Sequence, residues 1–381
     1  MSCETAPLKI PPFFCPVPPA LHPESELIDR RSIDWLRGYG LFPTPQGLAY
    51  LRGSHFPEMA CRAFPDGDTD RVQVMADFVQ WTLYDDVAVD GNDFPGLRAG
   101  EGQGTAPRIT SAGQLAEVAG KLLRMLEVPG ANLLPPDPWV ESLMAVRDRI
   151  ALLATPAQTQ RWTAAFREYL LATCWNRDLH HRRRLPTLAD YLTLRTPDGG
   201  VQMYVALSEI IGGYRLTADD LARPEVRALK EMACTIIAWD NDLFSHYKET
   251  LTESPCINLV DIVAAEHRCP AQAAVTEAVA LRDRVMLRYT HLADSVLPSL
   301  TAPQRRYVTD LGRLIAANID MSAGSLRYIN PLNGPPDKTL WADFHPVRTD
   351  TPSTTDPRPL PYSDLAGWWQ PVPDGVAARR P

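Results

Sequence analysis

The sequence has few lysines, no paired cysteine motif and no long apolar run. Only five of its 38 basic residues are lysines. Because the chain also has 46 acidic residues, its net charge is −8, and it has no overall positive field that could hold a nucleic acid. The seven cysteines show no Cys-x-x-Cys spacing, which predicts reduced thiols in a cytoplasmic protein without a zinc cluster. No stretch approaches about 18 consecutive apolar residues, and the N-terminus lacks a secretory signal pattern. We therefore expect no nucleic acid partner and no membrane span.

The composition is that of a chain able to bury a sizeable core, with 45% hydrophobic and 22% charged residues. Prolines gather at both ends of the chain. We therefore expect residues 1–30 to form a Pro-rich lead-in and residues 331–381 a mostly irregular tail, ordered where Trp341 or the pair Trp368 and Trp369 docks. Residues 31–330 lie between them and are expected to form one domain.

Within that domain, apolar residues recur at helical spacing, and few alternating runs are bounded by hairpin turns. The pattern predicts an all-α fold, a single bundle of long helices that encloses a central apolar cavity. The segment 91–110 is rich in glycine and polar residues and predicts a loop. The predicted helices span 32–39, 69–89, 111–126, 139–153, 158–176, 187–195, 201–211, 225–249, 257–266, 270–297 and 303–328.

An acidic cluster ends an apolar stripe in the segment VMADFVQWTLYDDVAVD. Phe78 and Trp81 belong to this stripe, and Asp85 is its last member at helical spacing. Asp86 and Asp90 are four residues apart on an adjoining face, at the helix end where the dipole disfavours anions. The cluster indicates either a bound cation or a solvated helix end. The aromatic residues are typical of a cavity wall or of ordinary core packing.

A second polar cluster lies in IIAWDNDLFSHYKE. Asn241, Ser245 and Glu249 stand at i, i+4 and i+8, which places their side-chain oxygens on one helix face. Amide, hydroxyl and carboxylate oxygens are hard ligands that suit Mg²⁺. Such residues also meet by chance on surface helices, but two clusters of this kind on separate apolar helices are less expected by chance. The sequence therefore indicates a magnesium site.

The two segments resemble those of the bacterial class I terpene synthases, whose metal motifs are DDxx(x)D and N-D-x-x-S-x-x-x-E. In YLTLRTPDGG, Arg195 is similar to the diphosphate-sensing arginine of that family, with Asp198 and Gly199 at the positions of its linker and effector residues. Pro197 limits continuation of a helix and glycine permits positive φ, so a break is expected here, with backbone carbonyls turned toward the cavity. The Pro-rich opening also resembles the family's N-terminal strand, which packs over the site.

Further residues match the family near the end of the last long helix. Arg327 and Tyr328 resemble its C-terminal Arg-Tyr pair, and Lys248 stands where the family has a diphosphate-binding base. Met321 takes a position where the family often has Trp, six residues before Arg327, and this change can alter the cavity and the product. The resemblance implies that Arg195, Lys248, Arg327 and Tyr328 bind diphosphate.

The resemblance also implies three Mg²⁺ ions, one of them held by Asn241, Ser245 and Glu249. Asp85 and Asp86 would hold the other two. Asp90 is the third member of the acidic motif, but three residues rather than two separate it from Asp86, which weakens its assignment as a ligand. Phe78, Trp81 and Met321 would line the cavity in which a carbocation is shielded from water.

These features imply a terpene cyclase that ionises a linear prenyl diphosphate, cyclises the cation and releases diphosphate. Farnesyl diphosphate and a sesquiterpene product are expected, with geranylgeranyl diphosphate and a diterpene as the alternative. A chain-elongating prenyltransferase would need a second Asp-rich motif where this chain has Asn241 and Ser245. The alternative outside enzymes is a helical isoprenoid-binding protein without turnover. A homodimer, common in this family, is the remaining expectation.

Overall fold

The computed structural model describes residues 8–89, 111–252, 257–329, 344, 347–362 and 365–370, and for residues 84–89 and 252 it describes the backbone alone. Helices dominate these residues, and two short strands pair at one side. In chain order the elements are β1 (Phe13–Phe14), α1 (Ser25–Gly38), α2 (Pro45–Ser54), α3 (Phe56–Ala63), α4 (Thr69–Val89), α5 (Ala112–Glu127), α6 (Pro138–Leu153), α7 (Pro156–His181), α8 (Leu188–Asp198), α9 (Val201–Ile211), α10 (Ala218–Ala222), α11 (Pro224–Thr252), α12 (Leu259–His267), α13 (Ala271–Val296), η1 (Leu297–Ser299), α14 (Ala302–Gly324), α15 (Leu326–Ile329), β2 (Arg348–Thr349) and η2 (Ala366–Trp369).

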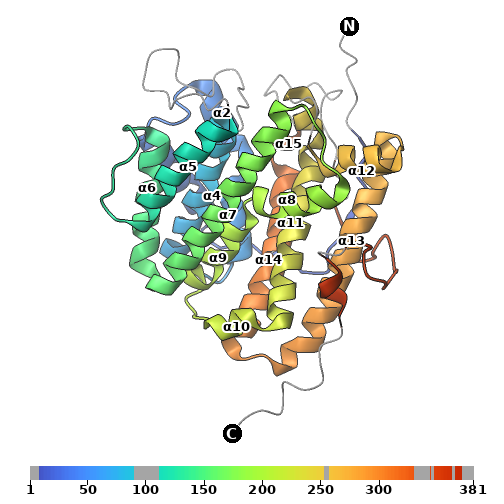
Figure 1. Ribbon diagram of the computed structural model, residues 1–381. Coiled ribbons are helices and arrows are strands. Elements are labelled where there is room, and N and C mark those ends of the chain that lie inside the picture. Colours follow the sequence, from blue (N-terminus) through green and yellow to red (C-terminus); the bar gives the residue numbers. More distant parts are fainter. Residues whose placement is uncertain are drawn as a thin grey trace.

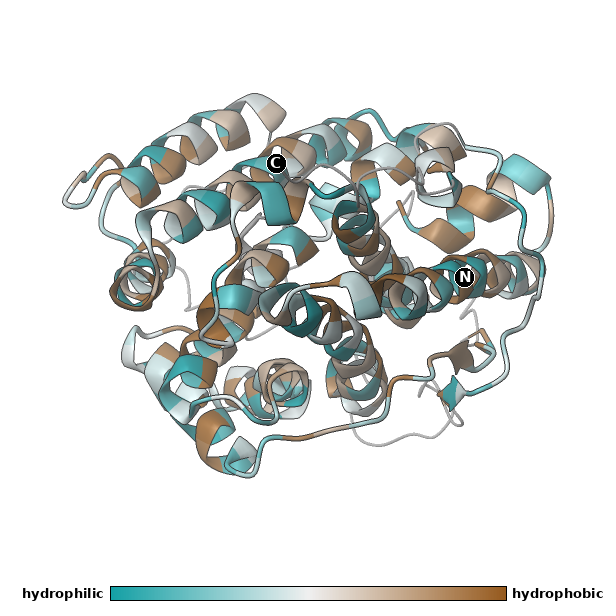
Figure 2. Ribbon diagram, turned by 90° about the horizontal axis from the view of Figure 1, so that it is seen from below, coloured by the Kyte–Doolittle hydropathy of each residue, from teal (hydrophilic) through white to brown (hydrophobic). Residues whose placement is uncertain are grey.

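Helix α11 runs through the middle of the bundle and packs against α14, α13, α9 and α8 (Figure 1). Its residues Leu229, Ile236 and Leu243 recur every two turns and are buried, so one apolar face follows the helix along its length. Figure 2 shows hydrophobic and hydrophilic residues alternating around individual helices. This is the amphipathic pattern that apolar spacing predicts, and the all-α fold is confirmed.

Some helices begin or end where the sequence pattern did not place them. Helix α1 begins at Ser25, inside the predicted lead-in, and neither α2 nor α3 was predicted. Helices α2 and α3 are short and have a proline in their first turn, which looks like a break in the sequence although proline is well tolerated there. Helix α10, with only five residues, was not predicted either. The helices α4, α7, α11, α13 and α14 agree with their predictions to within a few residues.

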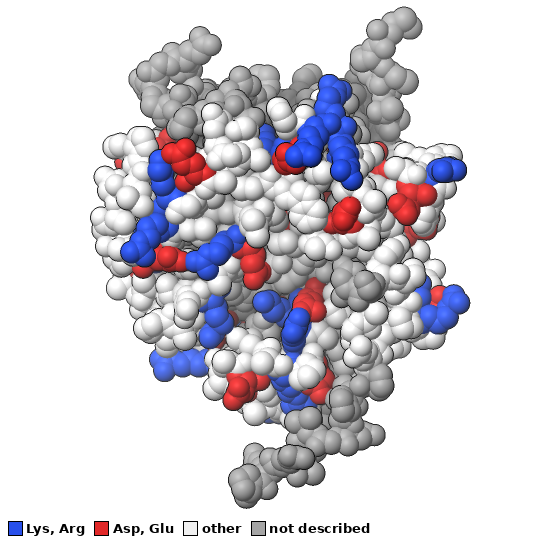
Figure 3. Space-filling model, viewed as in Figure 1, with Lys and Arg blue, Asp and Glu red and all other residues white. Residues whose placement is uncertain are grey.

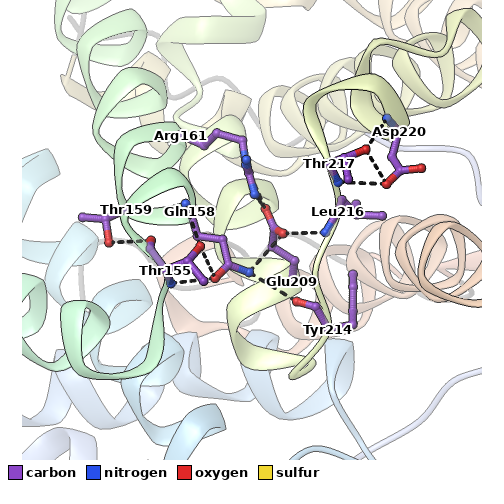
Figure 4. Close-up of polar contacts among 9 residues, drawn as sticks. All are labelled: Thr155, Gln158, Thr159, Arg161, Glu209, Tyr214, Leu216, Thr217 and Asp220. Atoms are coloured by element: carbon purple, nitrogen blue, oxygen red, sulfur yellow. Dashed lines mark hydrogen bonds and ion pairs between the residues drawn. The ribbon is translucent and has the colours of Figure 1, made fainter.

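One buried carboxylate ties the start of α7 to the connection between α9 and α10 (Figure 4). Glu209 accepts hydrogen bonds from Arg161 Nε at 2.9 Å, from Gln158 Nε2 at 3.0 Å and from the backbone N–H of Leu216 at 3.1 Å. Gln158 also closes a capping box with Thr155 at the first turn of α7. Helices α7 and α9 are therefore held together at one end.

Strand β1 is fixed to the bundle by a buried arginine on α13. The guanidinium of Arg282 donates from Nε to Asp240 Oδ1 at 2.7 Å and from Nη1 to the carbonyl oxygen of Phe14. Asp283 Oδ1 accepts the backbone N–H of Phe14 at 3.0 Å. The side chains of Arg282, Asp240 and Asp283 are all 0% exposed, so a charged group links the strand to α11 and α13 inside the core.

We expect Arg282→Met to lower the free energy of unfolding by about 3–5 kcal/mol, because it leaves two buried carboxylates without their counter-charge. Urea unfolding followed by circular dichroism measures the change. The control is Arg227→Met, which removes an exposed arginine from an i, i+4 pair with Glu231 on α11 and should change stability little. Equal unfolding midpoints for the two variants would contradict this role of Arg282.

Segments near both ends of the described chain pack against the bundle, and two of them pair with each other. Strand β1 pairs in parallel with β2, with Phe13 opposite Arg348, and Arg348 Nη1 donates to Asp320 on α14 at 2.9 Å. Further along, Trp368 is buried and its Nε1 donates to Glu231 on α11 at 2.9 Å. The tail is thus ordered at the tryptophan pair, as expected, whereas Trp341 lies outside the described residues.

The surface carries charges of both signs. On the face shown in Figure 3, basic and acidic side chains are mixed and neither covers a broad area. In the described part of the chain, no helix is both long enough and apolar enough to cross a membrane. The cysteines of that part are all free thiols, as predicted, and they are Cys15, Cys61, Cys174, Cys234 and Cys269.

Candidate active site

A cavity of about 380 Å³ lies among helices α3, α4, α7, α8, α9, α11, α14 and α15. Its wall combines apolar and aromatic side chains with a group of charged ones. Among the lining residues are Met59, Val79, Tyr169, Tyr204 and Ile237, together with Arg177 and His180. The predicted site residues that line it are Arg195, Asp198, Gly199, Asn241, Lys248, Glu249, Met321, Arg327 and Tyr328.

Asn241 connects three of the predicted motifs. Its side-chain oxygen accepts a hydrogen bond from Arg195 Nη2 at 2.8 Å, and its Nδ2 donates to the hydroxyl of Tyr328 at 2.9 Å. These residues come from α11, α8 and α15, which are far apart in the sequence. The structure therefore brings the N-D-x-x-S-x-x-x-E segment, the arginine of α8 and the Arg-Tyr pair to one point of the cavity.

Asp242 is a site residue that the sequence analysis did not single out. Its side chain is buried, and Oδ1 accepts from Arg195 Nε at 2.6 Å. Its Oδ2 accepts the backbone N–H of Leu259 at 3.0 Å, at the first turn of α12. Asp242 thus orients the arginine and anchors a neighbouring helix. The only signal in the sequence was its place beside Asn241, because its partners are distant along the chain.

The helix break at the end of α8 lies where it was expected, but its geometry differs. Helix α8 continues through Pro197 and ends at Asp198, which accepts a hydrogen bond from Asn176 Nδ2 at 2.9 Å. Gly199 has φ −67°, and the positive φ of 66° falls on Gly200 instead. A Cβ on Gly199 would lie 3.3 Å from the Cβ of Ala238, so this glycine permits close packing of α8 on α11.

Glu249 and Ser245 form a hydrogen-bonded group at the C-terminal part of α11. Burial alone would raise the pKa of Glu249, but the Lys248 ammonium and the hydrogen bonds from Ser245 and Asn258 hold it below its usual value. Asn258 Nδ2 donates to Glu249 Oε2 at 2.9 Å. Glu249 is therefore ionised at neutral pH. Ser245 is 1% exposed and is not among the lining residues.

Arg327 enters the cavity wall beside aromatic rings. Its guanidinium lies 5.7 Å from the ring centroid of Tyr328 and 5.6 Å from that of Phe56, and its Nη1 donates to the hydroxyl of Tyr50 at 2.7 Å. Tyr50 belongs to α2, a helix that the sequence pattern did not predict, so this contact had no sequence signal. The aromatic faces favour a buried cation at this position.

The predicted cavity residues divide into two layers. Met321 lines the cavity, but Phe78 and Trp81 are absent from the lining residues and are 0% exposed. Trp81 stacks on Trp139, and Phe78 lies edge-on to Tyr204, which does line the cavity, at a ring-centroid distance of 5.8 Å. Phe78 and Trp81 therefore form part of the aromatic core behind the wall.

The acidic motif is only partly covered by the structure. Asp85 and Asp86 belong to the last turns of α4, with the backbone alone described, and Asp90 lies outside the described residues. Within the ranges that are described, His, Cys, Asp and Glu form no group of three or more able to hold a metal ion.

The chain is similar to known terpene synthases over most of its length. Residues 104–288 match the family model for terpene synthase family 2, C-terminal metal binding. The chain is 55% identical to bonnadiene synthase of Allokutzneria albata, covering 95% of this chain and 98% of that protein. It is 33% identical to (+)-(1(10)E,4E,6S,7R)-germacradien-6-ol synthase of Streptomyces pratensis, with 97% and 99% covered.

A solved structure of similar shape is the SVS_A2 protein from ancestral sequence reconstruction, with a TM-score of 0.78 and 28% identity over 95% of this chain and 98% of that one. The matched family model is one of metal binding, so a divalent metal ion belongs to the family's chemistry. The fold, the cavity and these similarities agree. The chain belongs to the bacterial class I terpene synthases, which act as lyases on prenyl diphosphates.

Proposed function

We propose that this protein is a magnesium-dependent cyclase that ionises a linear prenyl diphosphate, directs cyclisation of the carbocation and releases diphosphate. The observation that carries the proposal is the position of Asn241, on the cavity wall between Arg195 and Tyr328. Basic groups and oxygen ligands meet there beside apolar residues such as Ile237 and Met321. A diphosphate head and a hydrocarbon tail need these two environments side by side.

The oxygen donors present fit a hard divalent cation. Glu249 is ionised, and Asn241 and Ser245 supply neutral oxygens from the same helix, a set that suits Mg²⁺. These three would hold one ion, and Asp85 and Asp86, with Asp90 as a further candidate, would hold the other two. Bound Mg²⁺ supplies positive charge where the leaving diphosphate becomes more negative.

The chain's own cations would bind the diphosphate oxygens. Arg195, Lys248 and Arg327 all line the cavity, and the planar guanidinium groups suit multidentate contacts with phosphate. Tyr328 adds a hydroxyl donor. Because Arg195 also contacts Asp198 through an ion pair of 3.8 Å, a shift of the arginine toward diphosphate would move the end of α8 and Gly199 with it. We infer that binding is coupled to ionisation in this way.

Two substrate lengths have support. Farnesyl diphosphate is the first candidate, and the cavity volume of about 380 Å³ lies within the usual range for small-molecule pockets. A relative 31% identical to this chain, from Streptomyces clavuligerus, is named as a (+)-T-muurolol synthase that cyclises (2E,6E)-farnesyl diphosphate. Geranylgeranyl diphosphate is the second candidate, because Met321 in the wall is flexible and adapts to a larger tail.

Incubation with C10, C15, C20 and C25 diphosphates and Mg²⁺ should give diphosphate and a cyclic terpene from the C15 substrate. Gas chromatography with mass detection identifies the product, and a phosphate assay follows diphosphate release. EDTA should abolish both signals, and added Mg²⁺ should restore them. Prenyl diphosphate binding without any release of diphosphate would instead identify a passive isoprenoid-binding protein. A cyclic product from the C20 substrate alone would favour the second candidate.

We also propose that the protein forms a homodimer, as its resemblance to the family implies. Sedimentation equilibrium of the full chain tests this directly. A mass near twice 42.3 kDa is expected, and a mass equal to that of the single chain at all concentrations would contradict it.

A further inference from the structure

One face of α7 lines the cavity and changes in character along the helix. Tyr169, Thr173, Arg177 and His180 recur at helical spacing and all belong to the cavity wall. Tyr169 lies against the aromatic core, with its ring centroid 6.0 Å from that of Phe166. Arg177 and His180 follow about 12–16 Å further along the helix axis and make this end of the face polar. The residues assigned so far to diphosphate lie on α8, α11 and α15, so α7 has no assigned part in that site.

The polar end of this face is close to the C-terminal part of α11 and to the end of α8. Burial lowers the pKa of His180, the charge of Arg177 lowers it further, and the charge of Glu249 raises it. Both charges therefore lie within electrostatic range of the same imidazole ring. Asn176, the residue before Arg177, donates from Nδ2 to Asp198 Oδ2 at 2.9 Å. The end of α7 thus adjoins the two regions to which the proposed function assigns metal binding and diphosphate sensing.

Arg177 contributes a positive charge to this end of the cavity, and part of its guanidinium is unsatisfied. Its Nη2 is buried and has no hydrogen-bond partner among the described residues. Arg195, in the same cavity wall, is already paired with Asp242 at 2.6 Å. A buried N–H without an acceptor destabilises a fold, and such groups in native proteins call for an explanation. An anion bound in the cavity would satisfy both the donor and the charge.

A purely structural explanation accounts for only part of this arrangement. Arg177 lies one turn before the end of α7, where any cation stabilises the helix dipole. Arg182 already supplies an exposed cation at that helix end, paired with Asp178 at 2.9 Å and outside the cavity wall. The dipole therefore does not explain why a guanidinium nitrogen is buried in the wall. A prenyl tail has no acceptor, whereas the diphosphate of the same substrate has charged oxygens that suit a guanidinium.

We propose that Arg177 is a further diphosphate-binding residue, which donates from its buried Nη2 to an oxygen of the substrate's diphosphate group. This inference rests on the proposed function and adds α7 to the helices that bind the diphosphate. Through Asn176 and Asp198, a movement of Arg177 toward the diphosphate would also be transmitted to the end of α8, where Arg195 contacts Asp198. Two arginines on separate helices would then respond to the same group.

The test measures how tightly inorganic diphosphate binds in the presence of Mg²⁺, by isothermal titration calorimetry of wild-type protein and Arg177→Gln. Glutamine keeps a hydrogen-bonding side chain but removes the charge. We expect the dissociation constant to rise about 10–30-fold, because a charge-assisted hydrogen bond is lost. Binding of farnesol, which has the prenyl tail without the diphosphate, should be unchanged when followed by tryptophan fluorescence. Arg177→Lys keeps the charge without the planar fork and should bind diphosphate with intermediate affinity.

The matched control is Arg182→Gln, which removes a positive charge from the same end of α7. Both glutamine variants should have similar melting temperatures without ligand. Only Arg177→Gln should show a smaller rise in melting temperature than wild type when Mg²⁺ and diphosphate are added.

Equal affinity of wild type and Arg177→Gln for diphosphate would overturn the proposal. So would a parallel loss of farnesol and diphosphate binding with a lower melting temperature in the absence of ligand, because this would show that Arg177 acts through the fold. A wild-type protein that binds no diphosphate in the presence of Mg²⁺ would contradict the proposed function itself.

Discussion

Replacing Asn241 by alanine is expected to lower product formation by about 10²–10³-fold while the protein stays helical by circular dichroism. The loss would be large because Asn241 is both a proposed metal ligand and the group that holds Arg195 and Tyr328 in place. Glu249→Ala should have a similar effect, because it removes the ionised oxygen ligand of the same helix. The measurement is the initial rate of diphosphate release at saturating Mg²⁺.

The same helix offers a control. Thr250 follows Glu249 directly but is exposed, and its hydroxyl donates to the carbonyl oxygen of Tyr247. Thr250→Ala should therefore keep the wild-type rate. If either Asn241→Ala or Glu249→Ala retained full activity, the assignment of α11 as a metal-binding helix would have to be abandoned.

Arg195→Lys should slow diphosphate release by about 10²-fold and change the melting temperature much less. The guanidinium bonds to Asp242 at 2.6 Å and to Asn241 at 2.8 Å at the same time. A lysine ammonium keeps the charge and can still neutralise Asp242, but it lacks the planar fork that makes these contacts together. The defect should thus appear in the ionisation step, which single-turnover kinetics isolate from substrate binding.

Arg182→Lys is the comparison for this substitution. Arg182 caps the end of α7 and forms an exposed i, i+4 pair with Asp178, so its replacement should leave turnover unaffected. Wild-type turnover in Arg195→Lys would refute the diphosphate-sensing role. A melting temperature that falls in step with the rate would show instead that Arg195 acts mainly by stabilising the fold.

The sequence predicted the helices whose apolar residues recur over many turns, such as α11 and α14, because burial of one face imposes that period. It also predicted which residues of α11 share a face, since 3.6 residues per turn fixes the spacing of Asn241 and Glu249. It could not predict which apolar stripe forms the cavity wall. Phe78 and Trp81 have the spacing of buried residues, and only tertiary packing places Tyr204 in front of Phe78.

Contacts between segments that are distant in the sequence could not be predicted from the sequence pattern either. Tyr50 contacts Arg327, which is 277 residues away in the sequence, and Asp242 joins α8 to α12. Neither set of contacts produces a periodic pattern of residues in the local sequence. Arg177 illustrates a different limit. Its residue type and place on α7 are ordinary for a helix, and its unsatisfied Nη2 becomes visible only when the neighbouring side chains are in place.

The pairing of β1 with β2 has a consequence for how the chain is made. Cys15 and Arg348, which are joined by a hydrogen bond in the strand region, are separated by 333 residues. A ribosome adding about 5–20 residues per second would need roughly 20–70 seconds to connect them. During that time the backbone edge of the nascent β1 strand lacks the partner strand that later covers it. A chaperone or a neighbouring chain could bind this edge until β2 has been made.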